Sequence, residues 1–99
     1  MKHGLEKDEY STPLNCAVGY RKVGDVLLMK GEGISWGGRT IRFRGEAAIP
    51  TGTAIEVHIA GVKGVAPPLV VYLEIQACAS EAPAEFLLNG AIKGIISRA

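Results

Sequence analysis

The segment Arg39-Thr40-Ile41-Arg42-Phe43-Arg44 alternates between polar and apolar side chains. Successive side chains on a β-strand point to opposite faces, so this pattern predicts a strand with Ile41 and Phe43 on the inner face. The same period of two returns in residues 55–59 and again in residues 71–77, where Ala77 is the last predicted inward residue. A helix would instead repeat its apolar residues every three or four positions, so these segments indicate a β protein.

Connections rich in glycine and proline separate the predicted strands. The chain has 13 glycines and 5 prolines in 99 residues. Turns are predicted at Gly24-Asp25, at Trp36-Gly37-Gly38, and around Pro50 and Gly52, where these residue types favour tight reversals. The predicted strands cover residues 14–23, 26–34, 39–44, 55–59, 71–77 and 86–96. A glycine bend is expected in the last strand, and residues 84–88 alternatively form a helix.

About six strands without a strong helix predict an all-β fold. A small six-stranded antiparallel β-barrel suits this length, because closure leaves no exposed strand edge. A sandwich of two sheets is the alternative. Residues 1–13 are polar and mixed in charge, so they predict a flexible N-terminal arm ahead of a barrel domain spanning residues 14–99.

Charge argues against a nucleic-acid partner. The chain carries 11 Lys and Arg against 10 Asp and Glu, a net charge of +1. Proteins that bind a polyanion usually show a strong basic excess and, for single strands, stacking aromatic side chains. Aromatic residues make up only 6% of this chain, so a nucleic-acid-binding barrel is disfavoured.

The sequence predicts a cytoplasmic protein without membrane insertion. Its first ten residues lack the apolar core of a signal peptide. The most apolar stretch, residues 65–73, is interrupted by Pro67 and Pro68 and is too short to span a bilayer. Cys16 and Cys78 lie far apart and do not have the spacing of a zinc site, so they are expected to be reduced and to pack as small hydrophobes.

A resemblance to a known family lies in residues 31–43, which read GEGISWGGRTIRF. Ser35 and Gly38 fit the Ser and final Gly of the Asp/Asn-x-Ser-x-x-Gly turn, and residues 49–57 fit the downstream Pro-x-Gly turn and strand. With residues 69–78 and 85–96 as later strands, residues 14–96 resemble the PilZ domain family. The resemblance implies a six-stranded barrel that binds the bacterial second messenger cyclic di-GMP.

The resemblance also implies how such a ligand is held, and this chain departs from it. Family members use an Arg-x-x-x-Arg motif in the arm and the Asp or Asn of the turn. Here the arm has no arginine, its nearest cation is Lys7, and Gly33 stands where the Asp or Asn belongs. Losing a bidentate, desolvated charge pair typically costs roughly 2–5 kcal/mol, so tight nucleotide binding is not expected.

The sequence therefore predicts a non-enzymatic PilZ-like signalling or adaptor domain with a degenerate cyclic di-GMP site. It would act through protein contacts in bacterial motility, pilus or second-messenger signalling, with no cofactor. The alternative is a genuine cyclic di-GMP effector with a non-standard site, and its candidate ligand residues are Ser35, Gly38, Arg39 and Lys7.

Candidate partner-binding residues are Trp36, Arg42 and Arg44. Trp36 serves either as an anchor for a partner or as a cover for one barrel end. Arg39, Arg42 and Arg44 form either a local patch for an anion or acidic partner, joined by Arg21-Lys22 if the strands are adjacent, or a solvated face with charges paired across strands to Glu56 or Glu74.

No catalytic or metal-ligating group is predicted. His58 alternates with the core residues of its strand and is expected to face outward without a metal partner. The carboxylates stand singly at outward positions, so no acid–base pair emerges.

Overall fold

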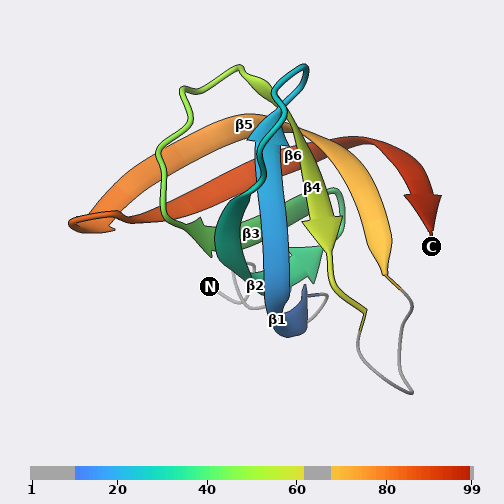
Figure 1. Cartoon of the computed structure of the whole chain (residues 1–99). Coiled ribbons are helices and arrows are strands. Elements are labelled where there is room, and N and C mark those ends of the chain that lie inside the picture. The colour runs from blue at the N-terminus through green and yellow to red at the C-terminus, as the bar shows by residue number, and fades with distance from the viewer. Residues whose placement is uncertain (1–10, 62–67, 99) are drawn as a thin grey trace.

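The computed structural model describes residues 11–61 and 68–98, which form a closed barrel of six antiparallel strands without a helix (Figure 1). The predicted all-β class and the six-stranded barrel are confirmed, and the sandwich alternative is wrong. The strands are β1 (Ser11–Lys22), β2 (Met29–Gly37), β3 (Thr40–Gly45), β4 (Ala54–Ile59), β5 (Leu69–Ala82) and β6 (Glu85–Arg98).

The barrel order is β1-β2-β3-β6-β5-β4, and β4 pairs with β1 to close it. Most neighbouring strands are consecutive in the chain and pair antiparallel, as β-hairpins do. The long-range contacts are the β1–β4 and β3–β6 pairings, which connect the first and second halves of the chain. The β5–β6 hairpin is longer than the other strands and projects beyond the barrel (Figure 1).

The barrel interior holds a single apolar core. Within the segments 39–44, 55–59 and 71–75, every side chain predicted to face inward is buried. Tyr20 and Phe43 pack edge to face with ring centroids 5.0 Å apart. The buried hydrophobic residues are Val18, Tyr20, Ile41, Phe43, Ile49, Ile55, Val57, Ile59, Val71, Leu73, Ile75 and Leu88.

Ala77 does not continue the predicted inward series. The β5–β6 register shifts between Ile75 and Ala77, and this bulge moves Ala77 to the exposed face. A bulge shifts the alternation by one residue, so a simple period of two fails beyond it.

The strand boundaries differ from the predicted ones near the N-terminus. β1 begins at Ser11, so the last part of the predicted arm pairs with the end of β2, while residues 1–10 lie outside the described residues. β2 begins at Met29 instead of Val26 and continues to Gly37, beyond the predicted break at residues 36–38. Ala84 lies in the β5–β6 turn and residues 85–88 belong to β6, so the alternative helix is wrong.

Residues 23–28 form a loop because a turn closes directly after β1. The Asp25 N–H donates to the Lys22 carbonyl at 2.9 Å, and Gly24 adopts a positive φ of 99°. Positive φ suits glycine, which confirms the turn predicted at Gly24-Asp25. Arg21 Nη1 also donates to the Val26 carbonyl at 2.8 Å. This hydrogen bond stabilises the loop conformation of residues 23–28 against a strand.

The predicted turn after Ile49 is also confirmed. Thr53 N–H donates to the Pro50 carbonyl at 3.2 Å, and Gly52 has a φ of 90°. In the described part of the chain, no helix is long and apolar enough to cross a bilayer.

Candidate functional site

The β2–β3 hairpin gathers most of the residues predicted for a ligand site. Ser35 lies opposite Arg42 in the strand pairing. Gly38 and Arg39 form the two-residue turn between Gly37 and Thr40, and Gly38 has a φ of 59°. The predicted residues Ser35, Arg42, Gly38 and Arg39 are therefore neighbours on one hairpin, whereas Lys7 lies outside the described residues.

Asn89 extends this hairpin site in a way that the sequence did not indicate. It lies opposite Arg42 on the other side of β3, so Ser35, Arg42 and Asn89 form a polar row across three strands. Asn89 Oδ1 is shielded from solvent and has no hydrogen-bond partner among the described residues. Only the strand register reveals this neighbour, because nearly half of the chain separates Asn89 from Arg42.

Packing explains the absence of a side chain at Gly33. Gly33 is buried, and a Cβ atom added there would lie 3.0 Å from Leu14 Cβ and 3.1 Å from Leu14 Cδ1. Leu14 packs against the core from β1. The space beside position 33 is thus filled by Leu14, and a carboxylate there would have to displace it.

Trp36 lies close to the turn of the β2–β3 hairpin, and its side chain contacts the barrel interior. It lies opposite Ile41, is half-buried and packs against the hydrophobic core. This contact matches the interpretation in which Trp36 covers one end of the barrel, while its exposed part remains available to a partner.

Among the described residues, Arg44 is the one arginine of the predicted patch that forms an ion pair, and its partners are not the expected ones. Arg44 Nε lies 2.9 Å from Glu81 Oε1 and 3.9 Å from Glu85 Oε2. Glu56 and Glu74, the expected partners, instead pair with Arg21 at 2.8 Å and with Lys93 at 3.4 Å. Arg42 is exposed and has no ion pair in the described part of the chain.

Arg21-Lys22 do not join this patch. β2 lies between β1 and β3, so Arg21 is on a different face of the barrel from Arg42 and Arg44. The prediction that depended on adjacency of these strands is wrong, because the chain closes the barrel through β1 and β4.

Arg21, Glu56 and His58 form a row of ionisable side chains on the outer face of β1 and β4. Arg21 Nε donates to Glu56 Oε1 at 2.8 Å, and this hydrogen bond lowers the pKa of the Glu56 carboxyl. His58 points outward as predicted, with its Nε2 atom 3.4 Å from Glu56 Oε2. The carboxylate is therefore held between two basic groups.

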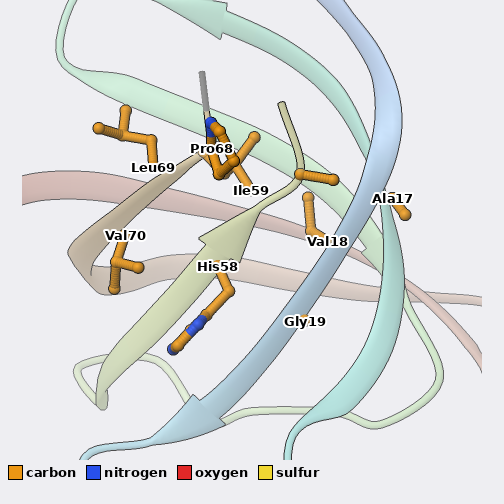
Figure 2. Close-up of a pocket in the computed structure, with 9 residues that line it drawn as sticks. Ala17, Val18, Gly19, His58, Ile59, Pro68, Leu69 and Val70 are labelled. Carbon is orange, nitrogen blue, oxygen red and sulfur yellow. The ribbon is translucent and has the colours of Figure 1, made fainter. Parts of the chain in front are cut away.

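Beside this row lies an apolar hollow of about 430 Å³, which the sequence did not predict (Figure 2). In Figure 2, residues from β1 line one side, and residues from β4 and β5 line the other. Its walls are mostly apolar, and the His58 imidazole is the main polar side chain. The lining residues are Ala17, Val18, Gly19, His58, Ile59, Ala60, Pro68, Leu69 and Val70.

The loop formed by residues 23–28 presents aliphatic side chains at the end of β1, beside the start of β4, where the Val23 N–H donates to the Ala54 carbonyl at 3.2 Å. Val26 is 80% exposed and Leu27 is 81% exposed, the two largest values among the exposed hydrophobic residues of the described chain. Leu28 lies against Gly19, which lines the hollow, since a Cβ atom at Gly19 would be 3.3 Å from Leu28 Cδ1. Leu28 thus connects the loop to one wall of the hollow, and the loop and the hollow together are called here the docking face.

The sequence does not predict the docking face, because the pattern predicts that Val26 and Leu28 belong to a strand. A run of three aliphatic residues resembles a buried strand when the turn at Gly24 is taken as a short connection. The charged residues Lys22 and Asp25, which precede the aliphatic run, are the sequence feature that favours a loop here.

The cysteines are free and half-buried, and both pack against the core as expected. Burial raises the pKa of the Cys16 thiol. Among the residues that the structure describes, no group of three or more His, Cys, Asp or Glu side chains is placed to hold a metal ion.

No protein-family model, curated protein or solved structure matches this chain.

Proposed function

We propose that the chain is a non-enzymatic, cytoplasmic PilZ-like adaptor that acts by binding a protein partner at the docking face. The observation that carries this proposal is the exposure of Val26 and Leu27, at 80% and 81%. Contact of exposed aliphatic side chains with water is unfavourable, so a partner that covers them gains binding free energy. The neighbouring hollow offers space for an apolar side chain of that partner.

The charges around the docking face support a largely apolar contact. Arg21 is occupied by Glu56 and by the Val26 carbonyl, and Glu56 also lies beside His58. A partner would not have to strip water from an unpaired Arg21 or Glu56, which limits the desolvation penalty of binding.

Photo-crosslinking tests this proposal. Leu27 is replaced by a photoreactive phenylalanine derivative, and crosslinked proteins are identified after irradiation in the cells that make the protein. A Leu27→Asp variant competes poorly for the captured partner, because a charged side chain must lose its water on docking.

The matched control is Ala84→Asp, which introduces the same charge at an exposed position in the turn of the projecting β5–β6 hairpin (Figure 1). The expected result is that Ala84→Asp competes like the unmodified protein. Equal competition by Leu27→Asp would contradict the proposal.

A second candidate, cyclic di-GMP binding, is supported by the polar row of Ser35, Arg42 and Asn89. Within residues 11–61 and 68–98, Arg42 has no ion pair and the neighbouring Asn89 amide oxygen has no hydrogen-bond partner, an arrangement that suits a phosphate and a base edge. Calorimetric titration with the dinucleotide tests it, and an absence of heat at millimolar ligand would reject this candidate.

A further inference from the structure

The projecting β5–β6 hairpin leaves part of one strand without a neighbour. On its outer side β5 pairs with β4 only as far as Glu74. Two further bonds follow, from the Gly52 N–H to the Ile75 carbonyl at 2.7 Å and from the Ile75 N–H to the Thr53 carbonyl at 3.0 Å. For residues 76–82, no backbone bond on this side is found among the described residues.

The other strand of the hairpin is covered over the same length. β3 pairs with β6 from Phe86 to Ala91. Within the projecting part of the hairpin, the open row of N–H and C=O groups therefore belongs to β5 (Figure 1). Barrel closure removes edges only where every strand finds a neighbour.

This β5 edge lacks the usual charged protection against strand pairing. Proteins commonly block open edges with lysine, proline or inward charges. Residues 76–82 contain no lysine, arginine or proline, and Glu81 is their only charged residue. Because β6 and β3 lie on the covered side, the ion pair with Arg44 draws the Glu81 carboxylate away from the open edge.

Small side chains surround the open edge on both faces of the sheet. Ala77 and Ala79 are exposed on the outer face, and Ser80 is exposed on the other. Cys78 is half-buried against the core. Large or β-branched side chains on an added strand would find room beside these residues, and such cross-strand contacts stabilise sheets.

Register shifts on both sides of residues 77–80 limit the regular part of this edge. Four residues at about 3.3 Å each extend roughly 13 Å. Two copies paired over this length would bury far less than the roughly 1,200–2,000 Å² of a stable interface. The edge therefore suits a short extended segment of another protein better than a second copy of this chain.

We propose that the outer edge of β5, at residues 76–82, accepts an extended, uncharged segment of a protein partner as an additional antiparallel strand. This inference rests on the proposed function of partner binding but uses a different surface from the docking face. Main-chain hydrogen bonds would supply much of the affinity, and alternating bulky side chains would supply the selectivity.

The test uses a capped heptapeptide that alternates threonine and valine, titrated into ¹⁵N-labelled protein. Amide shifts and slowed hydrogen exchange are expected at residues 76–82. Methylating the backbone nitrogens on one edge of the peptide removes the donors that face the protein, and methylating the other edge leaves them intact. The first change abolishes binding and the second preserves it; equal binding by both peptides would overturn the proposal.

Protein variants provide the matched comparison. Ala79→Lys places a charge beside the edge and is expected to weaken peptide binding about tenfold, equivalent to about 1.4 kcal/mol. Ala84→Lys adds the same charge in the hairpin turn and is expected to bind like the unmodified protein. Unchanged affinity in Ala79→Lys would contradict the edge site.

The location of the shifts separates this proposal from the docking face. Shifts confined to residues 23–28 and the hollow would overturn the edge site and leave the proposed function standing. Peptide binding at residues 76–82, together with unchanged partner capture in Leu27→Asp, would support the edge site and contradict partner binding at the docking face. Concentration-dependent shifts at residues 76–82 without peptide would show that a second copy is the occupant and overturn the inference.

Discussion

Gly45 is a residue at which a single methyl group is expected to disturb the core. Its added Cβ would overlap the Tyr20 ring and hydroxyl. That hydroxyl cannot move easily, since it donates to the Ala47 carbonyl at 2.7 Å and accepts from the Ala47 N–H at 2.8 Å. Gly45→Ala is therefore expected to lower the free energy of unfolding by about 3 kcal/mol, measured by urea denaturation.

Gly94→Ala is the matched control, because its Cβ would lie 4.0 Å from the nearest side-chain atom, Tyr72 Cδ2. We expect a change within about 0.5 kcal/mol. A similar loss in both variants would contradict the role of the contact with Tyr20.

Glu56 is expected to make stability depend on acidity. The hydrogen bond from Arg21 lowers its pKa in the folded chain. The stabilisation is then complete above the pKa of the unfolded chain, about 4.3, and is lost as the pH falls through the lower folded value. The difference in unfolding free energy between the unmodified protein and Glu56→Gln should shrink on acidification, as followed by urea midpoints from neutral pH to about pH 3.

A constant difference between these proteins across that range would contradict the role of the carboxylate. Arg21→Leu provides a second check, because it removes the group that lowers the pKa of Glu56. Its urea midpoint should be less sensitive to acid than that of the unmodified protein.

Individual inward residues were predictable where the strand was regular. Ile41, Phe43 and Val57 follow directly from alternation, and all are fully buried. Arg44 and Glu81 could not be matched from the sequence, because their meeting depends on which strands are adjacent. The same is true of Asn89 and Arg42.

At the level of the element, the β2–β3 hairpin depends on the backbone conformation of Gly38. Its φ of 59° is the left-handed region, and no atom lies within 4 Å of an added Cβ. Gly38→Ala should therefore destabilise the protein through backbone strain alone, by about 1 kcal/mol. Gly38→Asn should cost less, since asparagine tolerates this region better.

Thermal unfolding of both variants measures this difference. An equal loss for alanine and asparagine would contradict the backbone explanation. A loss confined to ligand binding would instead support the role of Gly38 in the alternative nucleotide site.

Strand existence was readable from the sequence, but strand ends and irregularities were not. The residues 26–28 fit a strand by composition and still form a loop, because Arg21 and the turn at Gly24 fix the backbone locally. The shift after Ile75 has no clear sequence signal, although it decides where Ala77 points. The docking face and the β5 edge both arise from such irregular regions.

The whole molecule is expected to fold slowly for its size. The β1–β4 and β3–β6 pairings join segments that are distant in the chain, so large loops must close before these contacts form. Refolding from urea should take milliseconds to seconds, followed by the fluorescence of Trp36, the only tryptophan. Complete refolding within microseconds would contradict this expectation.

Barrel closure was predictable, because an open sheet of six short strands would leave two strand edges exposed. The order of the strands was not predictable. The sequence offered no means of choosing β6 over β1 as the second neighbour of β3. The docking face was the least predictable feature, since its hollow combines residues of β1, β4 and β5.

The contact between Leu14 and position 33 has a consequence for how this surface can change through mutation. A larger residue at position 33 collides with Leu14, whose Cβ would be only 3.0 Å away. A smaller residue at position 14 alone would leave a cavity beside the core. The two positions are therefore expected to be epistatic: an acidic group at position 33 should cost less stability when position 14 carries a smaller residue than when it carries leucine.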